Sequence, residues 1–144
     1  MDKPVFFEAT EPTPEYLNGI NALLPQLSTT ATAMSMDDLS QLTASDNTRL
    51  FFVSVAGRIV GMTTLAIYRI PTGCRAWIED VVVDSEFRGM QLGRLLIEKT
   101  IEVARRLSPC TLMLTSRPSR VAANKLYQSI GFQYKETNAY KMTL

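Results

Sequence analysis

The chain has 144 residues, a formal net charge of +1 and no histidine. This length is enough for one domain with a sizeable core, and the near-neutral charge gives no electrostatic case for nucleic-acid binding. Without histidine, Ser-His-Asp and Cys-His catalysis and most zinc sites are excluded. Any catalysis must therefore rest on carboxylates, tyrosine, backbone dipoles or a bound cofactor.

Membrane and disulfide signals are absent from the sequence. No apolar run is long enough to span a bilayer, and Met1 to Pro4 do not start a signal-peptide pattern. We therefore expect a cytoplasmic protein. Cys74 and Cys110 are isolated and widely separated, which is typical of neither a metal cluster nor a disulfide framework. For Cys110 the sequence favours a buried structural thiol.

The first half of the chain predicts a strand, two helices and a hairpin. Thr13 is typical of a helix N-cap, because Pro14 follows at the first helical position and Glu15 lies in the first turn. Leucines and isoleucines then recur at helical spacing and favour packing on a sheet. The expected elements are a strand over Val5–Ala9, helices over 14–27 and 35–44, and strands over 50–55 and 59–68.

The second half predicts alternating strands and helices. An apolar strand over 76–83 leads into the clearest helix of the chain, which has one apolar and one charged side. The expected elements are this strand, helices over 92–107 and 121–129, a strand over 111–115, and a last hairpin formed by 132–134 and 140–143. Together they indicate a single mixed α/β domain over residues 1–144.

The junction between the strand and the helix has features of a phosphate site. Unpaired N–H groups at a helix N-terminus favour anions, and Gly89 and Gly93 allow backbone to approach a ligand closely. Arg88 and Arg94 can add charge-assisted hydrogen bonds. The loop matches neither the nucleoside-triphosphate P-loop nor the dinucleotide pattern Gly-x-Gly-x-x-Gly. An ordinary tight turn explains these residues equally well when the loop is taken alone.

The loop Arg88-Gly89-Met90-Gln91-Leu92-Gly93 resembles the acetyl-CoA pyrophosphate loop of the GNAT acetyltransferase superfamily, Arg/Gln-x-x-Gly-x-Gly/Ala. Gln91 stands where a glycine is usual. A second segment, Asn124-Lys125-Leu126-Tyr127-Gln128-Ser129-Ile130-Gly131-Phe132, looks like the superfamily's Asn-x-x-Tyr-x-x-x-Gly-Phe. The resemblance implies the GNAT fold, a central, mostly antiparallel sheet that splays in the middle and is flanked by helices.

The same resemblance implies acetyl-CoA as cofactor. The backbone of residues 88–94 would hold its pyrophosphate, and the backbone of residues 81–83 would pair with its pantetheine arm. Core packing alone also explains 81–83, and a surface amide also explains Asn124. The implied cofactor-binding residues are Val81, Val82, Val83, Arg88, Gly89, Met90, Gln91, Leu92, Gly93, Arg94, Asn124 and Tyr127.

Two residues are candidates for the chemistry. The resemblance favours Glu79 as the general base, acting directly or through water, and Tyr127 as the acid that protonates the leaving thiolate. Glu79 and Asp80 are adjacent, so their side chains point to opposite faces unless a bulge intervenes. Asp80 or water therefore remains open as the base, and a structural carboxylate remains open for Glu79. For Tyr127 the alternative is a tyrosine of the core.

The acceptor is weakly encoded. The expected function is transfer of acetyl from acetyl-CoA to a primary amine of a small molecule, by direct attack in a ternary complex. A protein N-terminal or lysine acetyltransferase and a non-catalytic acyl-CoA-binding module are the alternatives. Leu114-Thr115-Ser116-Arg117 stands where the amino-sugar-phosphate enzymes of the superfamily have acidic and cysteine-bearing residues, so their substrate does not transfer. Candidates for the acceptor wall include Tyr68 and Trp77, and a homodimer is expected.

Overall fold

The computed structural model describes residues 2–144. They divide into two compact units, one that ends at Leu114 and one that runs from Thr115 to Leu144. Each unit is described by itself.

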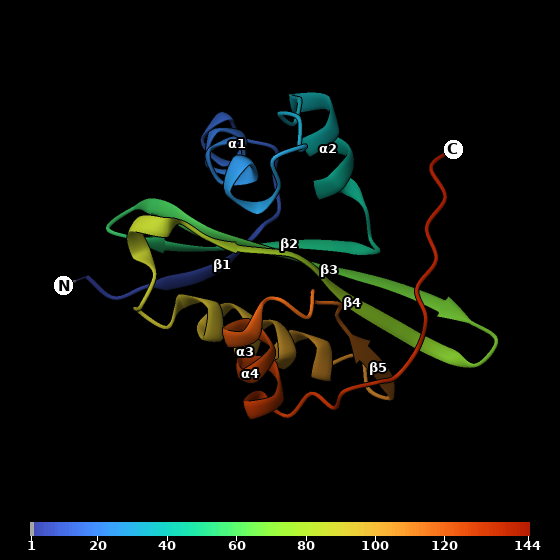
Figure 1. Cartoon of the computed structure of the whole chain (residues 1–144). Helices are drawn as coiled ribbons and strands as arrows, with labels where there is room; N and C mark the ends of the chain where they lie inside the picture. Colours follow the sequence, from blue (N-terminus) through green and yellow to red (C-terminus); the bar gives the residue numbers. More distant parts are fainter. Residues whose placement is uncertain (1) are drawn as a thin grey trace. The chain divides into compact units, whose positions relative to one another are not determined.

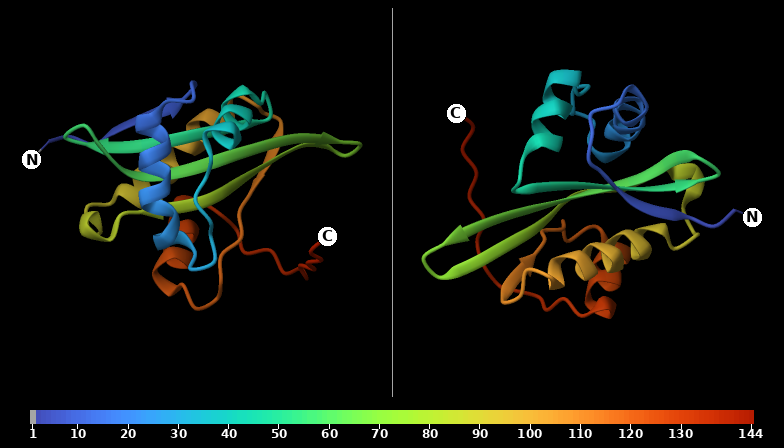
Figure 2. Two further views of the ribbon diagram at one scale, coloured as in Figure 1. Left: turned by 90° about the horizontal axis from the view of Figure 1, so that it is seen from above. Right: turned by 180° about the vertical axis from the view of Figure 1, so that it is seen from behind.

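The first unit is built on a five-stranded sheet (Figure 1). The strands lie in the order β1-β2-β3-β4-β5, and every neighbouring pair is antiparallel except the parallel pair β4 and β5. Helices α1 and α2 cover one face of the sheet and α3 covers the other (Figures 1 and 2). The elements are β1 Val5–Ala9, α1 Pro14–Leu27, α2 Met36–Ala44, β2 Thr48–Val55, β3 Arg58–Ile70, β4 Gly73–Val83, the short 3₁₀ helix η1 Ser85–Phe87, α3 Leu92–Arg105 and β5 Cys110–Met113.

Strand β2 supplies core to both faces of the sheet. Phe52 packs with Leu23 of α1 and Leu39 of α2, whereas the next residue, Val53, packs with Leu96 of α3. Successive side chains of a strand point to opposite faces, so an apolar run without alternation fits a strand covered on both sides.

The mixed α/β fold expected from the sequence is confirmed, with changes at the ends of elements. Strands β3 and β4 are longer than the predicted 59–68 and 76–83, because they continue into a hairpin closed at residues 71–72. Helix α3 ends at Arg105, two residues earlier than predicted, and β5 covers Cys110–Met113 rather than 111–115.

The second unit contains α4, Val121–Ile130. Gly131 ends the helix with a φ of 125°, and the N–H of Phe132 donates to the carbonyl of Tyr127 at 3.0 Å. The prediction of a last hairpin is wrong, since residues 132–144 contain no strand. An isolated two-stranded hairpin is marginal in water, and the alternating residues Tyr140, Met142 and Leu144 are exposed.

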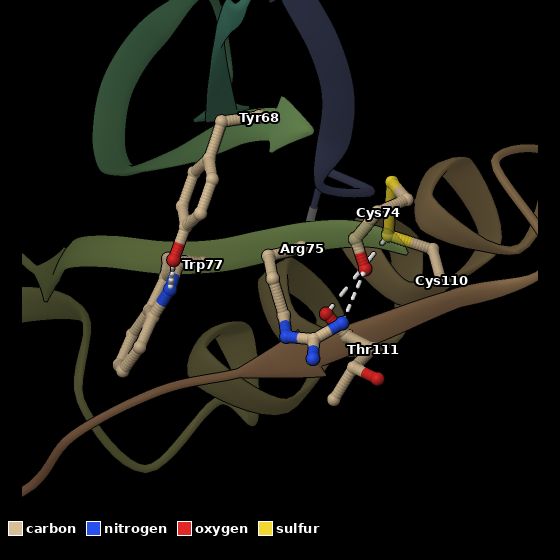
Figure 3. Close-up of a disulfide and its surroundings, with 6 residues drawn as sticks. All are labelled: Tyr68, Cys74, Arg75, Trp77, Cys110 and Thr111. Carbon is tan, nitrogen blue, oxygen red and sulfur yellow. Dashed lines mark hydrogen bonds between the residues drawn. A yellow bond between two sulfur atoms is a disulfide. The ribbon is translucent and has the colours of Figure 1, made fainter. Parts of the chain in front are cut away.

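The prediction for the cysteines is also wrong. Cys74 and Cys110 form a disulfide, with their Cα atoms 4.7 Å apart (Figure 3). They stand directly opposite each other in the parallel pair of β4 and β5. The sequence did not predict the bond, because the cysteines are 36 residues apart. Only the order of the strands makes them neighbours.

Candidate active site

A β-bulge in β4 sets the position of Glu79. Thr64 pairs with Glu79 and Met62 pairs with Val82, so the single residue Thr63 of β3 stands opposite Asp80 and Val81. Asp80 has a φ of 54°, and the hydroxyl of Thr63 donates to the carbonyl of Glu79 at 3.2 Å. The bulge changes the alternation of β4, as a two-against-one mismatch does.

The register also shows which face of the sheet carries Glu79. Met62 belongs to the core under α1 and α2, and Thr64, two residues further along β3, lies on the same face. Because directly paired residues share a face, Glu79 lies on the face that α1 and α2 cover. Its own side chain is exposed.

The carboxyl group of Glu79 has a pKa raised above its ordinary value. The main cause is partial desolvation, which disfavours the charged form, and the neighbouring charge of Asp80 adds to it. A base with a raised pKa binds a proton more strongly, which suits a group that must accept one near neutral pH.

The edge of β4 is open where the chain approaches α3. Strand β5 pairs with β4 only from Cys74 to Trp77, and among residues 2–144 no other strand pairs with that edge. The side chain of Val82 is nevertheless buried in the core under α1 and α2. The backbone of residues 81–83 can therefore pair with an extended ligand while the side chains pack.

One local and two long-range contacts hold the segment that follows β4. Asp84 is buried, accepts from the N–H of Glu86 at 3.0 Å and is paired with Arg58 at 3.0 Å. The N–H of Ser85 donates to the side chain of Gln26 at 2.8 Å. Sequence analysis missed all three as positioning residues. Arg58 and Gln26 lie far along the chain from this segment, and Asp84 takes its role partly from the distant Arg58.

The start of α3 differs from an ordinary helix start. Its N-cap residue, Gln91, adopts a left-handed conformation with a φ of 58°, and no side-chain hydrogen bond caps the helix. Gly89 has a φ of 79°. A Cβ added at Gly89 or at Gly93 would have no non-neighbouring heavy atom within 4 Å. The first amide groups of a helix have no intrahelical acceptor, so this start is suited to bind an anion.

The side chains of the predicted loop have different surroundings. Arg88 is exposed, whereas Leu92 is buried and Met90 packs against the core on the α3 side. The guanidinium of Arg94 pairs with Glu98 at 2.7 Å. For Met90 and Leu92, only the backbone is suited to contact a cofactor.

Asn124 and Tyr127 belong to the second unit. The side-chain amide of Asn124 donates to the carbonyl of Arg117 at 3.0 Å. Tyr127 is buried, its ring meets that of Phe132 edge to face, and desolvation raises the pKa of its hydroxyl while the charge of Arg120 lowers it. A raised pKa keeps the hydroxyl protonated at neutral pH, as a general acid requires.

Comparison with known families decides what this arrangement represents. The model of the acetyltransferase (GNAT) family matches residues 19–132. The chain belongs to the GNAT family. The matched region includes β4 with its bulge, the loop that precedes α3, and also the helix α4.

Individual relatives agree with this assignment. The chain is similar to a glucosamine 6-phosphate N-acetyltransferase from Trypanosoma brucei brucei, with 36% identity over 62% of this chain and 60% of that protein. A putative acetyltransferase from Agrobacterium tumefaciens has the same fold, with a TM-score of 0.84 and 24% identity over 96% of this chain and 99% of that one. An aminoglycoside N-acetyltransferase solved with CoA has a TM-score of 0.81 and 15% identity, over 99% and 96% of the two chains.

The part of the chain that the structure describes contains neither a metal-ligand cluster nor a membrane-spanning helix. Within residues 2–144, no group of three or more metal-ligating side chains is placed to hold an ion. In the same part of the chain, no helix has the length and apolar character needed to cross a bilayer.

Proposed function

We propose that this GNAT chain is an acetyl-CoA-dependent N-acetyltransferase that acts on the primary amine of a small molecule by direct attack in a ternary complex. The observation that carries the proposal is one continuous stretch of chain. In this stretch, Glu79, whose pKa is raised, comes first in the chain. The open edge of β4 follows it, and the helix α3, which has no side-chain cap, comes last.

The residues of this stretch fit the cofactor. The backbone of residues 81–83 pairs with the pantetheine arm as an added strand would. The amides around Gly89, Gln91 and Gly93 bind the pyrophosphate, and Arg88 adds a charge-assisted hydrogen bond. Bulk at Gly89 or Gly93 would fill the space that the pyrophosphate needs.

Acetyl-CoA supplies the activated acetyl thioester, and the chain supplies proton transfer and polarisation. Glu79, directly or through water, removes a proton from the ammonium form of the acceptor. A main-chain N–H near Val81 in the bulge polarises the thioester carbonyl, which costs no reorganisation during the reaction. Tyr127 donates its hydroxyl proton to the sulfur of the leaving thiolate.

A small-molecule acceptor is favoured by the relatives. The trypanosome protein is named for glucosamine 6-phosphate, and an aminoglycoside acetyltransferase was solved with sisomicin. The near-neutral charge, +1, does not favour a basic peptide as acceptor. A protein acetyltransferase and a non-catalytic acyl-CoA-binding module are the competing functions.

Three further expectations accompany this proposal. The family match crosses the boundary between the two units, which supports one domain over residues 1–144. The exposed Tyr140, Met142 and Leu144 alternate along the C-terminal segment, which supports a homodimer formed through it. A cytoplasmic location would make the Cys74–Cys110 bond dependent on redox conditions.

The deciding experiment has two parts. Acetyl-CoA at saturation should raise the melting temperature by several degrees, and a panel of primary amines should then release CoA thiol from it. Tyr127→Phe should keep the melting shift and lower kcat by roughly 10²-fold. A wild-type chain that does not respond to acetyl-CoA contradicts the proposal, and one that binds it but acetylates no amine favours the acyl-CoA-binding module.

A further inference from the structure

An aromatic pair lies on the hairpin of β3 and β4. The indole N–H of Trp77 donates to the hydroxyl of Tyr68 at 2.9 Å (Figure 3). Trp77 stands opposite Ala66, and Tyr68 stands opposite Arg75, so the two aromatic residues are diagonal neighbours across the strands. The indole therefore has a small residue, Ala66, directly across from it, and its hydrogen bond to Tyr68 restricts its rotation.

This pair shares a face of the sheet with Glu79. Arg75, Trp77 and Glu79 alternate along β4 before the bulge, so all three lie on the face that carries α1 and α2. Cys74 lies on the opposite face of the same strand. At about 3.4 Å per residue, Trp77 and Glu79 are about 7 Å apart along the strand.

The helices do not cover this part of the face. The core under α1 and α2 reaches Met62 and Val82, which lie at the bulge end of the hairpin, and Leu50 of β2, which stands opposite Thr64. Tyr68 is 43% exposed and Trp77 is half-buried. An exposed aromatic pair held in one orientation by its own hydrogen bond is more typical of a contact surface than of a core.

The charged neighbour on the other side of Trp77 is already engaged. The guanidinium of Arg75 donates to the carbonyl of Cys74 at 3.2 Å and to the hydroxyl of Thr72 at 3.2 Å. Arg75 is thus hydrogen-bonded within the turn of the hairpin. The other two groups of this row are the apolar indole of Trp77 and the exposed carboxylate of Glu79.

We infer that Trp77, fixed by Tyr68, is the surface on which the ring of a ring-bearing primary amine lies while the amine reaches Glu79. This inference rests on the proposed acetyltransferase function and adds a substrate class to it. The face of an indole packs against the C–H face of a saturated ring and attracts a nearby cation. Because Tyr68 already orders the indole, binding loses little side-chain freedom. Trp77 is therefore a specificity-determining residue for the acceptor.

Fluorescence tests the contact without any turnover, since Trp77 is the only tryptophan of the chain. The full chain saturated with CoA is titrated with cyclohexylmethylamine, D-glucosamine and n-heptylamine. The first and last have the same number of carbons and the same CH₂–NH₃⁺ group, and they differ in the ring. Ring amines should change the Trp77 emission with a half-saturation about tenfold lower than that of n-heptylamine.

Kinetics then separate specificity from folding. Trp77→Leu should raise KM for the ring amines about tenfold, leave KM for n-heptylamine and the affinity for acetyl-CoA unchanged, and leave kcat largely unaffected. Trp77→Phe retains a ring and should recover part of the loss. Tyr134→Leu removes a tyrosine that is 84% exposed in the second unit, and it should change none of these values.

The two proposals fail in different ways. If the emission of Trp77 responds to neither ring amine, or equally to ring and straight-chain amines, the inference about Trp77 is overturned even if acetylation occurs. If no amine releases thiol from bound acetyl-CoA, the proposed function fails, and the fluorescence titration still decides whether Trp77 contacts a ring amine.

Discussion

The starts of α1 and α2 differ from the stretch between Glu79 and Arg94 in how their backbone polar groups are hydrogen-bonded. Helix α1 begins with Thr13, whose hydroxyl accepts from the N–H of Tyr16 at 3.1 Å, and α2 begins with a complete capping box of Ser35 and Asp38. In the later stretch, α3 has no side-chain cap, and no strand within residues 2–144 pairs with the second edge of residues 81–83.

Backbone conformation shows the same contrast. Of the non-glycine residues with positive φ, Asp80 and Gln91 lie in the later stretch, and Ala56 lies in the tight turn between β2 and β3. Left-handed backbone is unfavourable for residues other than glycine, and unfavourable conformations gather at sites of function. We propose that α1 and α2, whose starts are capped by their own side chains, form a closed region, whereas residues 79–94 form an open region that a ligand completes.

The largest effect is expected where the ligand would complete the open region. Gly89→Asp places a carboxylate against the pyrophosphate, and like charges in contact cost several kcal/mol. We expect the affinity for acetyl-CoA to fall by roughly 10³-fold. Isothermal titration of the purified variant measures this loss.

Gly57 offers a matched control for backbone strain. Its φ is 80°, and that of Gly89 is 79°. A Cβ added at either glycine would have no non-neighbouring heavy atom within 4 Å. Gly57→Asp should thus have a similar cost in stability, about 1–2 kcal/mol, and should bind acetyl-CoA like the wild type. Equal losses of affinity in both variants would mean that strain, and not the pyrophosphate contact, explains Gly89→Asp.

The second effect concerns the short part of β4 whose edge is covered by β5. The Cys74–Cys110 disulfide joins β4 and β5 at the first pair of their short parallel ladder. The chain-entropy model predicts that a bond closing a loop of 36 residues stabilises the fold by about 3–4 kcal/mol. Chemical denaturation with and without a phosphine reductant should show a loss of this size.

Cys110→Ser supplies the control for the reductant. The variant should have the lower stability from the start and should not respond to reduction, since it has no disulfide to lose. If reduction leaves the denaturation midpoint of the wild type unchanged, the bond contributes nothing to stability in solution.

Sequence analysis predicted the features that depend on neighbouring residues. Thr13, Ser35 and the glycines around α3 are local signals, because caps and turns are made within a few residues. The loop and the helix after β4 could therefore be recognised. The resemblance to the GNAT superfamily then supplied the splayed sheet, which no local pattern shows.

The features that sequence analysis missed depend on strand order and register. The Cys74–Cys110 bond and the Arg58–Asp84 pair join residues that only the fold brings together. The bulge at Asp80, which the sequence left open, depends on the register of β3 and β4. The last hairpin failed for the opposite reason. Alternation at Tyr140 to Leu144 is necessary for a strand, but a strand also needs a partner, and residues 132–144 have none that the structure describes.

The third effect tests the base within the open region. The raised pKa of Glu79 predicts that kcat/KM falls, as the pH is lowered, at a higher pH than an ordinary glutamate would give. Glu79→Gln should lower kcat by about 10²-fold and abolish this acid limb. Asp80→Asn removes the neighbouring charge, so it should shift the limb to lower pH while retaining most of the rate. A limb that persists in Glu79→Gln assigns the base to another group.

The smallest effect is expected in the closed region, at the start of α2. Ser35 accepts from the N–H of Asp38 at 3.1 Å, and the Asp38 carboxylate accepts in return from the N–H of Ser35 at 3.4 Å. Ser35→Ala removes one of these bonds and should destabilise the fold by about 1 kcal/mol, while Ser35→Gly should cost only a few tenths. Since both residues lie outside the stretch 79–94, acetyl-CoA affinity and kcat should equal those of the wild type. Denaturation curves and a single titration of each variant measure both quantities. A loss of acetyl-CoA affinity in Ser35→Ala would contradict the separation of closed and open regions, because α2 would then contribute to the site through more than stability.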